Sequence, residues 1–544
     1  MRGRARAVLA VGITSVAMLA AACGGGGETT PGTTESGGAG GEISIRGCTP
    51  ENPLVPGNTS EVCGGNVVSA INAMLVHYNA DTAAPENDVA ESITPSADNK
   101  LFTIKLKPYK FHDGTDLKAK NFVDAWNYTA NGANGQAGSY FFSPIAGYAD
   151  VQCPDEECKQ KPKAETMSGL KVVDDTTFTI ATTEPVSNLP VRLGYSAFAP
   201  LPDSFFADPK AYEDKPVGAG PFEFVSKSTT EIVLKKFADY SGANTSNVDQ
   251  VTFRIYQDDA AAYADVVANN LDFTDAIPAD QLVGDAWKSD LDGRNGIQET
   301  GIMAWITFSP NDPQLKDNIE LRKAISMSIN RDEIAKQIFN GTVTPATSWV
   351  SPVVDGYKAG VCGDSCTFDA AAAKAAYEKA GGYDGTLTMT YNNDGAGNKD
   401  YSEAVCNQVK NNLGLDCTAV GTVDFATFNK KIDAGDLKGM FRSGWQMDYP
   451  SIENFLTPIY AKGADSNWSK FDNADFEKLL AEAAAAPSVD EANAKYQAAE
   501  AILAQEFPTA PLWARSTPFG WSTNVTDAKL NAFGYLDLSS IKTV

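Results

Sequence analysis

Runs with the period of a β-strand alternate with amphipathic helical runs along the chain from residue 42 onward. LFTIKLK (101–107) alternates apolar and polar side chains, which predicts a strand with one buried face. HDGT (112–115) predicts a turn, because Asp-Gly gives the backbone the freedom that a turn requires. NFVDAWNY (121–128) places its apolar side chains on one face of a helix. The alternation continues without an internal repeat, so the sequence predicts a mixed α/β fold.

The first 23 residues carry the features of an export signal. MRGRAR supplies three arginines, residues 7–22 are apolar, and small residues precede Cys23. The pattern resembles a bacterial lipoprotein signal, although Leu19 lies one place earlier than the leucine of the usual motif. We therefore expect residues 1–22 to be a signal peptide and Cys23 to carry a lipid. The alternative is an ordinary signal peptide with a chance cysteine nearby.

A Gly-rich stretch, GGGGETTPGTTESGGAGG (24–41), follows the cysteine and is typical of a flexible tether. Residues 23–41 are therefore expected to be the lipidated cysteine and its tether. No later stretch reaches the ~18 consecutive apolar residues that a membrane-spanning helix needs. The sequence predicts an extracytoplasmic protein that a lipid on Cys23 anchors to the outer face of the cell membrane.

Composition agrees with an exported globular protein. Hydrophobic residues make up 43% of the chain and aromatic residues 10%, which is enough for large cores. The formal net charge is −25, and removal of the three N-terminal arginines makes it −28. A charge of this sign repels phosphate backbones and anionic head groups, so no nucleic acid partner is expected. At ~150 residues per unit, the length corresponds to about three domains or lobes.

The cysteines fall in neighbouring pairs once Cys23 is set aside. The pairs are Cys48 with Cys63, Cys153 with Cys158, Cys362 with Cys366, and Cys406 with Cys417. In an exported chain these predict disulfides, and we expect sequence-adjacent pairing, although eight cysteines allow 105 connectivities. The alternative is a zinc site, but the chain has only two histidines and thiols oxidise outside the cell. No metal is expected, and His112, in the predicted turn, is expected to have a structural role.

Four stretches, in the same order along the chain, resemble the signature of the family 5 extracellular solute-binding proteins, the substrate-binding components of peptide and nickel ABC importers. They are LFTIKLKPYKFHDGTDLKAKNFVDAW (101–126), PVGAGPFEF (216–224), ELRKAISMSINRDEI (320–334) and FDAAAAKAAYEKAGG (368–382). The chain departs from the family at Lys120 and Asn121, where an acidic pair is usual, and at Ala219, where threonine is common.

Two of these stretches also carry helix-end signals. Asn330 is expected to cap a helix, with Glu333 as its capping-box partner. Asp369 is expected to cap the Ala-rich helix, which Gly381 and Gly382 would end.

The resemblance implies a two-lobed, periplasmic-binding-protein-like α/β fold (type II, cluster C). An extra subdomain would be inserted in lobe I, and two crossovers would form the hinge. The expected ranges are 42–70, 175–307 and 512–544 for lobe I, 71–174 for the inserted subdomain and 308–511 for lobe II. The crossovers are expected near ITFSPND (306–312) and PTAPLWA (508–514). Ligand would lie between lobes that close around it.

The resemblance also points to RSGWQMDY (442–449) as the strand that lines the cleft. It implies that Asp448 pairs with the α-ammonium of a bound peptide and that Arg442 meets a ligand carboxylate. The backbone of Gly444 and Gln446 would bond to the peptide main chain, as an added strand does.

Trp445 and Tyr449 are expected at the same site, and TSEVC (59–63), which includes Cys63, is expected to supply an opposite strand. The alternatives are an exposed loop carboxylate at Asp448 and a core residue at Trp445.

These expectations favour a lipid-anchored, monomeric substrate-binding protein that captures oligopeptides and delivers them to an ABC permease. The alternative keeps the fold but binds a nickel chelate, haem, an opine or an oligosaccharide. An uncharged sugar would leave Asp448 and Arg442 unpaired, and a nickel binder would be expected to show a cleft histidine. The third hypothesis is an exported hydrolase. G-x-S-x-G and H-E-x-x-H motifs are absent from the sequence, so no enzyme activity and no cofactor are expected.

Overall fold

The computed structural model describes residues 40–544, apart from Ser60, Glu156, Glu157, Gln257, 394–396, Asp424 and Asp465. The predicted signal peptide, Cys23 and nearly all of the predicted tether lie outside the described residues. Within the described part, no helix is both long enough and apolar enough to cross a membrane.

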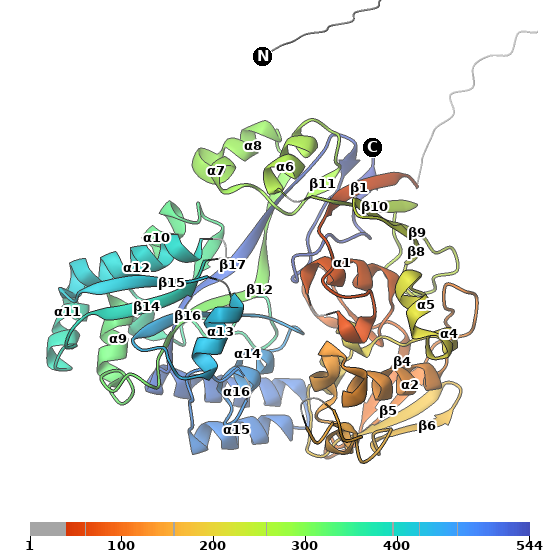
Figure 1. Ribbon diagram of the computed structural model, residues 1–544, viewed down its shortest axis with the longest axis horizontal. Coiled ribbons are helices and arrows are strands. Elements are labelled where there is room, and N and C mark those ends of the chain that lie inside the picture. The colour runs from red at the N-terminus through yellow and green to blue at the C-terminus, as the bar shows by residue number, and fades with distance from the viewer. Residues whose placement is uncertain are drawn as a thin grey trace, which may run out of the picture. The chain divides into compact units, whose positions relative to one another are not determined.

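The main sheet has eleven strands (Figure 1). In spatial order they are β15 (Cys417–Thr422), β14 (Leu387–Asn392), β16 (Met440–Gln446), β12 (Asn295–Phe308), β17 (Thr509–Trp521), β11 (Phe273–Thr274), β1 (Glu42–Gly47), β10 (Gln250–Ile255), β9 (Glu231–Lys236) and β8 (Phe222–Lys227), with β13 (Val343–Pro345) paired to β17.

Two long strands, β12 and β17, lie in the middle of this sheet and join its two halves. They have 14 and 13 residues and run antiparallel to each other. The first part of β12 pairs with the end of β17, which in turn pairs with β11. The last part of β12 pairs with the start of β17 on one side and with β16 on the other. Between Glu299 and Met303 the register of the β12–β17 pair shifts, so the ladder is interrupted where the neighbouring strands change.

A separate four-stranded sheet has the order β4 (Ala90–Pro95), β5 (Leu101–Leu106), β7 (Thr177–Ala181), β6 (Leu170–Asp174). Phe102, Ile104 and Leu106 are buried, which confirms the predicted strand. The predicted helix is also confirmed, because α2 (Ala119–Ala130) buries Phe122 and Trp126 beside this sheet. β7 belongs to this sheet although it follows residue 174, where the inserted subdomain was expected to end.

The remaining helices and strands are short or cover the main sheet (Figure 1). On the β14–β16 side they are α9 (Ile319–Met327), α10 (Arg331–Gln337), α11 (Ala370–Lys379), α12 (Asn398–Leu413), α13 (Phe425–Asp433), α14 (Glu453–Tyr460), α15 (Ala474–Ala484) and α16 (Val489–Glu506). Elsewhere they are α1 (Val62–Ile71), α3 (Leu189–Arg192), α4 (Asp203–Ala207), α5 (Pro209–Asp214), α6 (Asp259–Val267), α7 (Ala279–Leu282), α8 (Ala286–Asp290), β2 (Val76–Tyr78), β3 (Pro85–Asn87), β18 (Val525–Thr526) and β19 (Lys542–Thr543).

The predicted helix caps are largely present. Asp369 accepts hydrogen bonds from the first turn of α11, and Gly381 and Gly382 have positive φ beyond its end, as predicted. Asn330 caps α10 by accepting from the Glu333 backbone N–H. The reciprocal half of the capping box is wrong, because the Asn330 backbone N–H donates to the side chain of Gln408 instead.

All four predicted disulfides are present. Cys48–Cys63 joins the segment after β1 to α1, and Cys406–Cys417 joins α12 to β15. Cys153–Cys158 and Cys362–Cys366 each close a loop within a few residues. Sequence-adjacent pairing is thereby confirmed.

His112 has the structural role that the sequence predicts. Its Nδ1 accepts from the Gly218 backbone N–H, and Nε2 lies 3.0 Å from the Gly220 carbonyl oxygen. Burial lowers the pKa of the imidazole, so the neutral ring connects the turn to the loop before β8.

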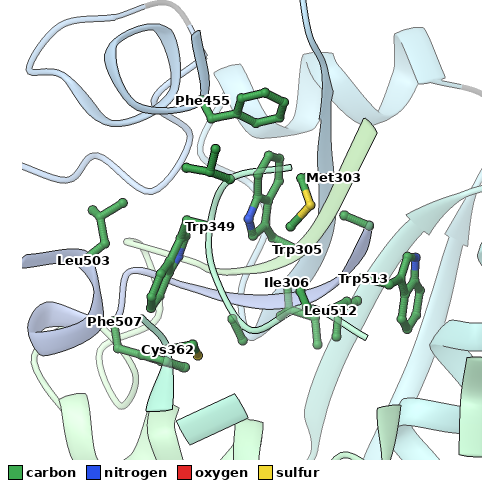
Figure 2. Close-up of a cluster of buried hydrophobic side chains, with 14 of the residues drawn as sticks. Met303, Trp305, Ile306, Trp349, Cys362, Phe455, Leu503, Phe507, Leu512 and Trp513 are labelled. Atoms are coloured by element: carbon green, nitrogen blue, oxygen red, sulfur yellow. The ribbon is translucent and has the colours of Figure 1, made fainter. Parts of the chain in front are cut away.

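A hydrophobic cluster surrounds the region where β12 and β17 pair (Figure 2). Trp305 on β12 lies beside Met303 in this cluster, and both are almost completely buried. Ala304, which lies between these two residues in β12, pairs with Trp513 of β17. Because neighbouring strand residues point to opposite faces, Trp305 and Trp513 lie on different faces of the sheet.

Candidate ligand-binding site

Asp448 lies two residues beyond the end of β16 and is held by one amide side chain. Its backbone N–H donates to Asn454 Oδ1 at 2.8 Å, and Asn454 Nδ2 donates to Asp448 Oδ2 at 3.0 Å. The Trp445 indole N–H donates to the same Asn454 oxygen. Asn454, in the first turn of α14, is 1% exposed. One buried amide therefore fixes both the carboxylate and the neighbouring tryptophan.

The surroundings of Asp448 disfavour its charged form. Burial raises the pKa of this carboxyl to about 6, although part of the residue remains accessible. The hydrogen bond from Asn454 and the more distant charge of Arg192 lower the pKa, while the Glu453 charge raises it. Among the described residues, Asp448 forms no ion pair. A cation that arrived next to it would stabilise the ionised form.

Tyrosines from the first 200 residues of the chain face Asp448. Burial first, and then the Asp448 charge, raise the pKa of the Tyr78, Tyr140 and Tyr195 hydroxyls. Tyr78 donates to the Val191 carbonyl oxygen at 2.6 Å. The site is therefore assembled from two parts of the chain that lie more than 200 residues apart.

An ion pair between the same two parts of the chain lies next to Asp448. Arg192 contacts the Glu453 carboxylate at 3.1 Å, and Glu453 is 3% exposed. Asn188 Nδ2 and the Tyr449 hydroxyl also donate to Glu453, at 2.8 and 2.7 Å. The Arg192 guanidinium lies 5.2 Å from the centre of the Tyr449 ring. Tyr449, a predicted ligand-binding residue, is 4% exposed, and its hydroxyl is bound to Glu453.

A second set of contacts joins these parts near the end of α15. The Ser187 backbone N–H donates to the Ala484 carbonyl oxygen, and the Ser187 hydroxyl donates to that of Ala483. Asn99 Nδ2 donates to the Ala486 carbonyl oxygen at 2.6 Å. Carbonyl groups at a helix C-terminus lack partners inside the helix. Residues from a distant part of the chain here supply those partners.

A cavity of ≈ 510 Å³ adjoins Asp448. Residues of β12, β16, α13, α14 and the 466–469 loop line it, and Trp305 and Ser443 are paired on one face of the sheet. Its wall is largely aromatic and includes Trp305, Phe425, Trp445, Tyr460 and Trp468. Gly444 and Gln446 also line the cavity, so four of the predicted site residues, with Trp445 and Asp448, lie together.

One edge of β16 is open beside this cavity. β12 pairs with β16 along its whole length, but β14 pairs only with Met440 and Phe441. No described strand pairs with the other edge from Arg442 to Gln446, and Gly444 and Gln446 are exposed. A Cβ at position 444 would meet the Met303 carbonyl oxygen at 2.8 Å, so glycine permits the close approach of β12. An extended ligand can therefore bond to this edge as an additional strand does.

Arg442 does not line the cavity with the other predicted residues. It lies on the opposite face of β16 from Ser443, because successive strand residues alternate. Its guanidinium lies 5.1 Å from the Phe425 ring centre and 5.5 Å from that of Phe428.

The prediction of an opposite strand at residues 59–63 is wrong. Val62 begins α1, and the Glu61 side chain caps this helix by accepting from the Gly64 backbone N–H. Cys63 lies in α1 and is bonded to Cys48. Thr59 and Glu61, rather than Cys63, line a second cavity of ≈ 460 Å³ that Tyr78 and Tyr195 also line.

Sequence reasoning missed five polar residues of the site: Tyr78, Asn188, Arg192, Glu453 and Asn454. Glu453 and Asn454 follow Asp448 closely, so the start of a helix just after the aromatic stretch was the available signal. No local signal marks the other three residues, because only the tertiary fold brings them to Asp448. No group of side chains suited to a metal ion occurs among the described residues.

Comparison with known proteins places this geometry in context. A family model, "Bacterial extracellular solute-binding proteins, family 5 Middle", matches residues 84–467. The oligopeptide-binding protein OppA of Bacillus subtilis is 24% identical over 476 residues, covering 85% of each chain. The solved structure of HbpA2 from Haemophilus parasuis has a TM-score of 0.79 at 21% identity and covers 93% of this chain and all of its own.

A solved complex of Haemophilus influenzae OppA with the peptide RPPGFSPFR has a TM-score of 0.70 at 22% identity, covering 92% of this chain and 99% of its own. These likenesses confirm the predicted two-lobed, mixed α/β fold.

Proposed function

Because the chain belongs to the family 5 bacterial extracellular solute-binding proteins, a family of transport proteins rather than enzymes, we propose that it captures short peptides. It would deliver them, as a monomer, to the permease of an ABC importer. The relative named oligopeptide-binding protein and the neighbour solved with a bound peptide support this proposal.

The observation that carries the proposal is the position of Asp448 beside the open edge of β16. A peptide offers an α-ammonium and a regular ladder of main-chain donors and acceptors. Asp448 is a carboxylate with no ion pair among the described residues, and the Gly444–Gln446 edge has unpaired strand positions. A receptor with these two features binds the groups that all peptides share.

Arg442 is the proposed partner of a ligand carboxylate. Its guanidinium is oriented by the Phe425 and Phe428 rings, and Phe425 also lines the cavity. A carboxylate at the far end of a bound peptide would then lie near Phe425, where α13 lines the cavity.

We also propose that the lobes move about the interrupted ladder of β12 and β17. The predicted crossovers, 306–312 and 508–514, include the last residues of β12 and the first of β17. The register shift between Glu299 and Met303, opposite Ala514–Ser516, gives each long strand a flexible point. Bending there would change the spacing between Asp448 and the tyrosines that face it.

Titration calorimetry with one peptide in free and N-acetylated forms tests the role of Asp448. Asp448→Asn keeps the shape but removes the charge. Truncation of one partner of a buried charge pair typically costs ~2–5 kcal/mol, or roughly thirty- to several-thousand-fold in affinity. The acetylated peptide lacks the ammonium, so it should bind both proteins weakly and with similar affinity.

Asp436→Asn is the matched control, because Asp436 is an exposed carboxylate in the same part of the chain. It should bind the free peptide as wild type does. Equal affinity of Asp448→Asn and wild type for the free peptide would show that Asp448 does not bind the ammonium. Mass spectrometry of co-purifying ligands gives a second readout: a ladder of short peptides supports the proposal, and a single metal chelate, haem or sugar overturns it.

The family is extracytoplasmic, and we propose that a lipid on Cys23 anchors this member to the membrane. Thioether lipidation needs the thiol, so Cys23→Ser should release the protein into the soluble fraction. Membrane association of Cys23→Ser at the wild-type level would contradict the anchor.

A further inference from the structure

Trp305, which lines the cavity beside Asp448, carries a hydrogen-bond donor that the protein leaves unused. Trp305 is 1% exposed, and its indole N–H has no hydrogen-bond partner among the described residues. Trp305 is one of the residues that line the cavity. A buried donor without a partner costs free energy, and most buried indole N–H groups in proteins are bonded. Trp349, by comparison, donates to Thr509 Oγ1 at 2.9 Å.

An unused acceptor lines the same cavity. Asn429, on α13, has its side-chain oxygen buried, and that atom has no hydrogen-bond partner among the described residues. Two pairs of polar groups at the cavity are bonded to each other: the Thr307 and Ser443 hydroxyls lie 2.7 Å apart, and the Tyr460 hydroxyl lies 2.8 Å from Thr509 Oγ1. Trp305 and Asn429, by contrast, each have a buried polar atom without a partner among the described residues.

The charge of the cavity restricts its occupant further. Asp448 is the one ionisable acidic or basic side chain among the described residues that line it. An anionic group would find no counter-charge there, and the proposed ligand ammonium already occupies Asp448. The aromatic wall offers planar, apolar surface to the remainder of the occupant.

We infer that this cavity selects a neutral ligand side chain that has an apolar or planar body and that both accepts and donates a hydrogen bond. The carboxamides of glutamine and asparagine and the phenol of tyrosine have this chemistry. The inference rests on the proposed function, because the side chain belongs to a peptide whose ammonium binds Asp448. The ligand group would accept from Trp305 and donate to Asn429.

Calorimetry with matched tripeptides tests the inference. The tripeptides differ at one position only, the first or the second. At that position tyrosine is compared with phenylalanine, and glutamine is compared with methionine and with glutamate. We expect wild type to prefer tyrosine over phenylalanine, and glutamine over both competitors, by about ten- to a hundredfold at one of these positions.

Trp305→Phe removes the N–H and keeps an aromatic ring, so the tyrosine preference should fall to about twofold. Trp513→Phe is the matched control. Trp513 is equally buried and its N–H also lacks a partner among the described residues, but it lies on the other face of the sheet and does not line the cavity. This control should keep the full preference. Asn429→Leu, on a partly exposed position, is a second variant if Trp305→Phe does not fold.

The outcomes separate this inference from the proposed function. If peptides bind through Asp448 but wild type does not distinguish the matched pairs, the inference is wrong and peptide capture stands. If Trp305→Phe or Asn429→Leu keeps the full preference, the assignment of the donor or acceptor is wrong. If no peptide binds wild type at any pH between 6 and 8, both the proposed function and the inference fail.

Discussion

Asp448 and Glu453 lie five residues apart in the same buried region, but the protein treats their carboxylates differently. Glu453 receives a cation, Arg192, together with the Asn188 amide and the Tyr449 hydroxyl. Asp448 receives the Asn454 amide and, among the described residues, no ion pair. The Glu453 carboxylate has its partners within the protein, whereas burial and the Glu453 charge together raise the pKa of Asp448 more than Asn454 and Arg192 lower it.

The difference shows which of the two charges is structural. A buried ion pair with extra hydrogen bonds on each partner connects parts of a fold, and here it joins residues 188–192 to 449–453. A buried carboxylate without a counter-charge costs stability, and a cation that binds beside it offsets that cost. The comparison therefore assigns cohesion of the site to Glu453 and supports the proposed role of Asp448 in ligand recognition.

The largest effect is expected from a substitution that breaks the Arg192–Glu453 ion pair. Arg192→Met leaves Glu453 buried without its cation and should lower the free energy of unfolding by ~3–5 kcal/mol. Urea denaturation followed by tryptophan fluorescence measures this change. Lys105→Met removes a cation from an exposed pair with Glu91 and should cost less than ~1 kcal/mol. A loss at Arg192 no larger than at Lys105 would contradict the structural role of the pair.

The next effect concerns the pH dependence of peptide affinity. The proposed pairing with a ligand ammonium needs ionised Asp448, and burial raises the pKa of this carboxyl to about 6. Affinity should be highest near pH 7 and should fall toward tenfold per pH unit well below 6, or ~1.4 kcal/mol per unit. It should fall again toward pH 8, because the peptide α-ammonium, with a pKa of ~7.7–8.0, loses its proton there. Calorimetry between pH 5 and 8 measures the profile, and Asp448→Asn should flatten its acidic side. A flat wild-type profile would exclude Asp448 as the titrating group.

The smallest effect sharpens the comparison with a third buried carboxyl. Glu500 is fully buried and accepts from the Ser348 hydroxyl and the Trp349 backbone N–H, and burial raises its pKa to about 7. A raised carboxyl pKa contributes stability at low pH that is lost as pH rises through the folded value. Glu500→Gln should therefore gain ~1 kcal/mol relative to wild type between pH 6 and 8.

Thermal unfolding at the two pH values measures the Glu500→Gln difference. Asp416→Asn is its control, because Asp416 is exposed and Lys410 lowers the pKa of this carboxyl instead. That control should not gain stability at pH 8. If Glu500→Gln and wild type respond equally to pH, Glu500 does not titrate in this range.

Features that depend on neighbours in sequence were predictable. The strand at 101–106, the helix at 119–130 and the cap of α11 follow from local periodicity and cap chemistry. The four disulfides join cysteines at most 15 residues apart, so sequence-adjacent pairing was sufficient. The failed half of the capping box shows the limit, because Gln408, 78 residues away, competes for the Asn330 backbone N–H.

Only the part of the site formed by β16 and the residues just after it was predictable from the sequence. Asp448 and Trp445 were visible as a charge within an aromatic stretch, and both line the cavity with Gly444 and Gln446. The expected strand at 59–63 failed because Glu61 starts a helix there. Arg192 and Tyr78 carry no local pattern, since the distant pairing of segments sets their distance to Asp448. The unused donor of Trp305 is likewise visible only when the contacts of its neighbours are known.

The central position of β17 has a consequence for how the chain reaches its final state. Residues 509–521 lie between β12 and β11 in the middle of the main sheet, and they pair with a strand of each half. Strands from residues 42–47 and 250–255 pair early in the sequence, but the two ends of the sheet remain unjoined until this late segment is available. Such non-local pairing is slow to form. During synthesis, the two halves of the main sheet therefore cannot join before residues 509–521 are available, and a chain without them would expose the uncovered edge of β12 to chaperones and proteases.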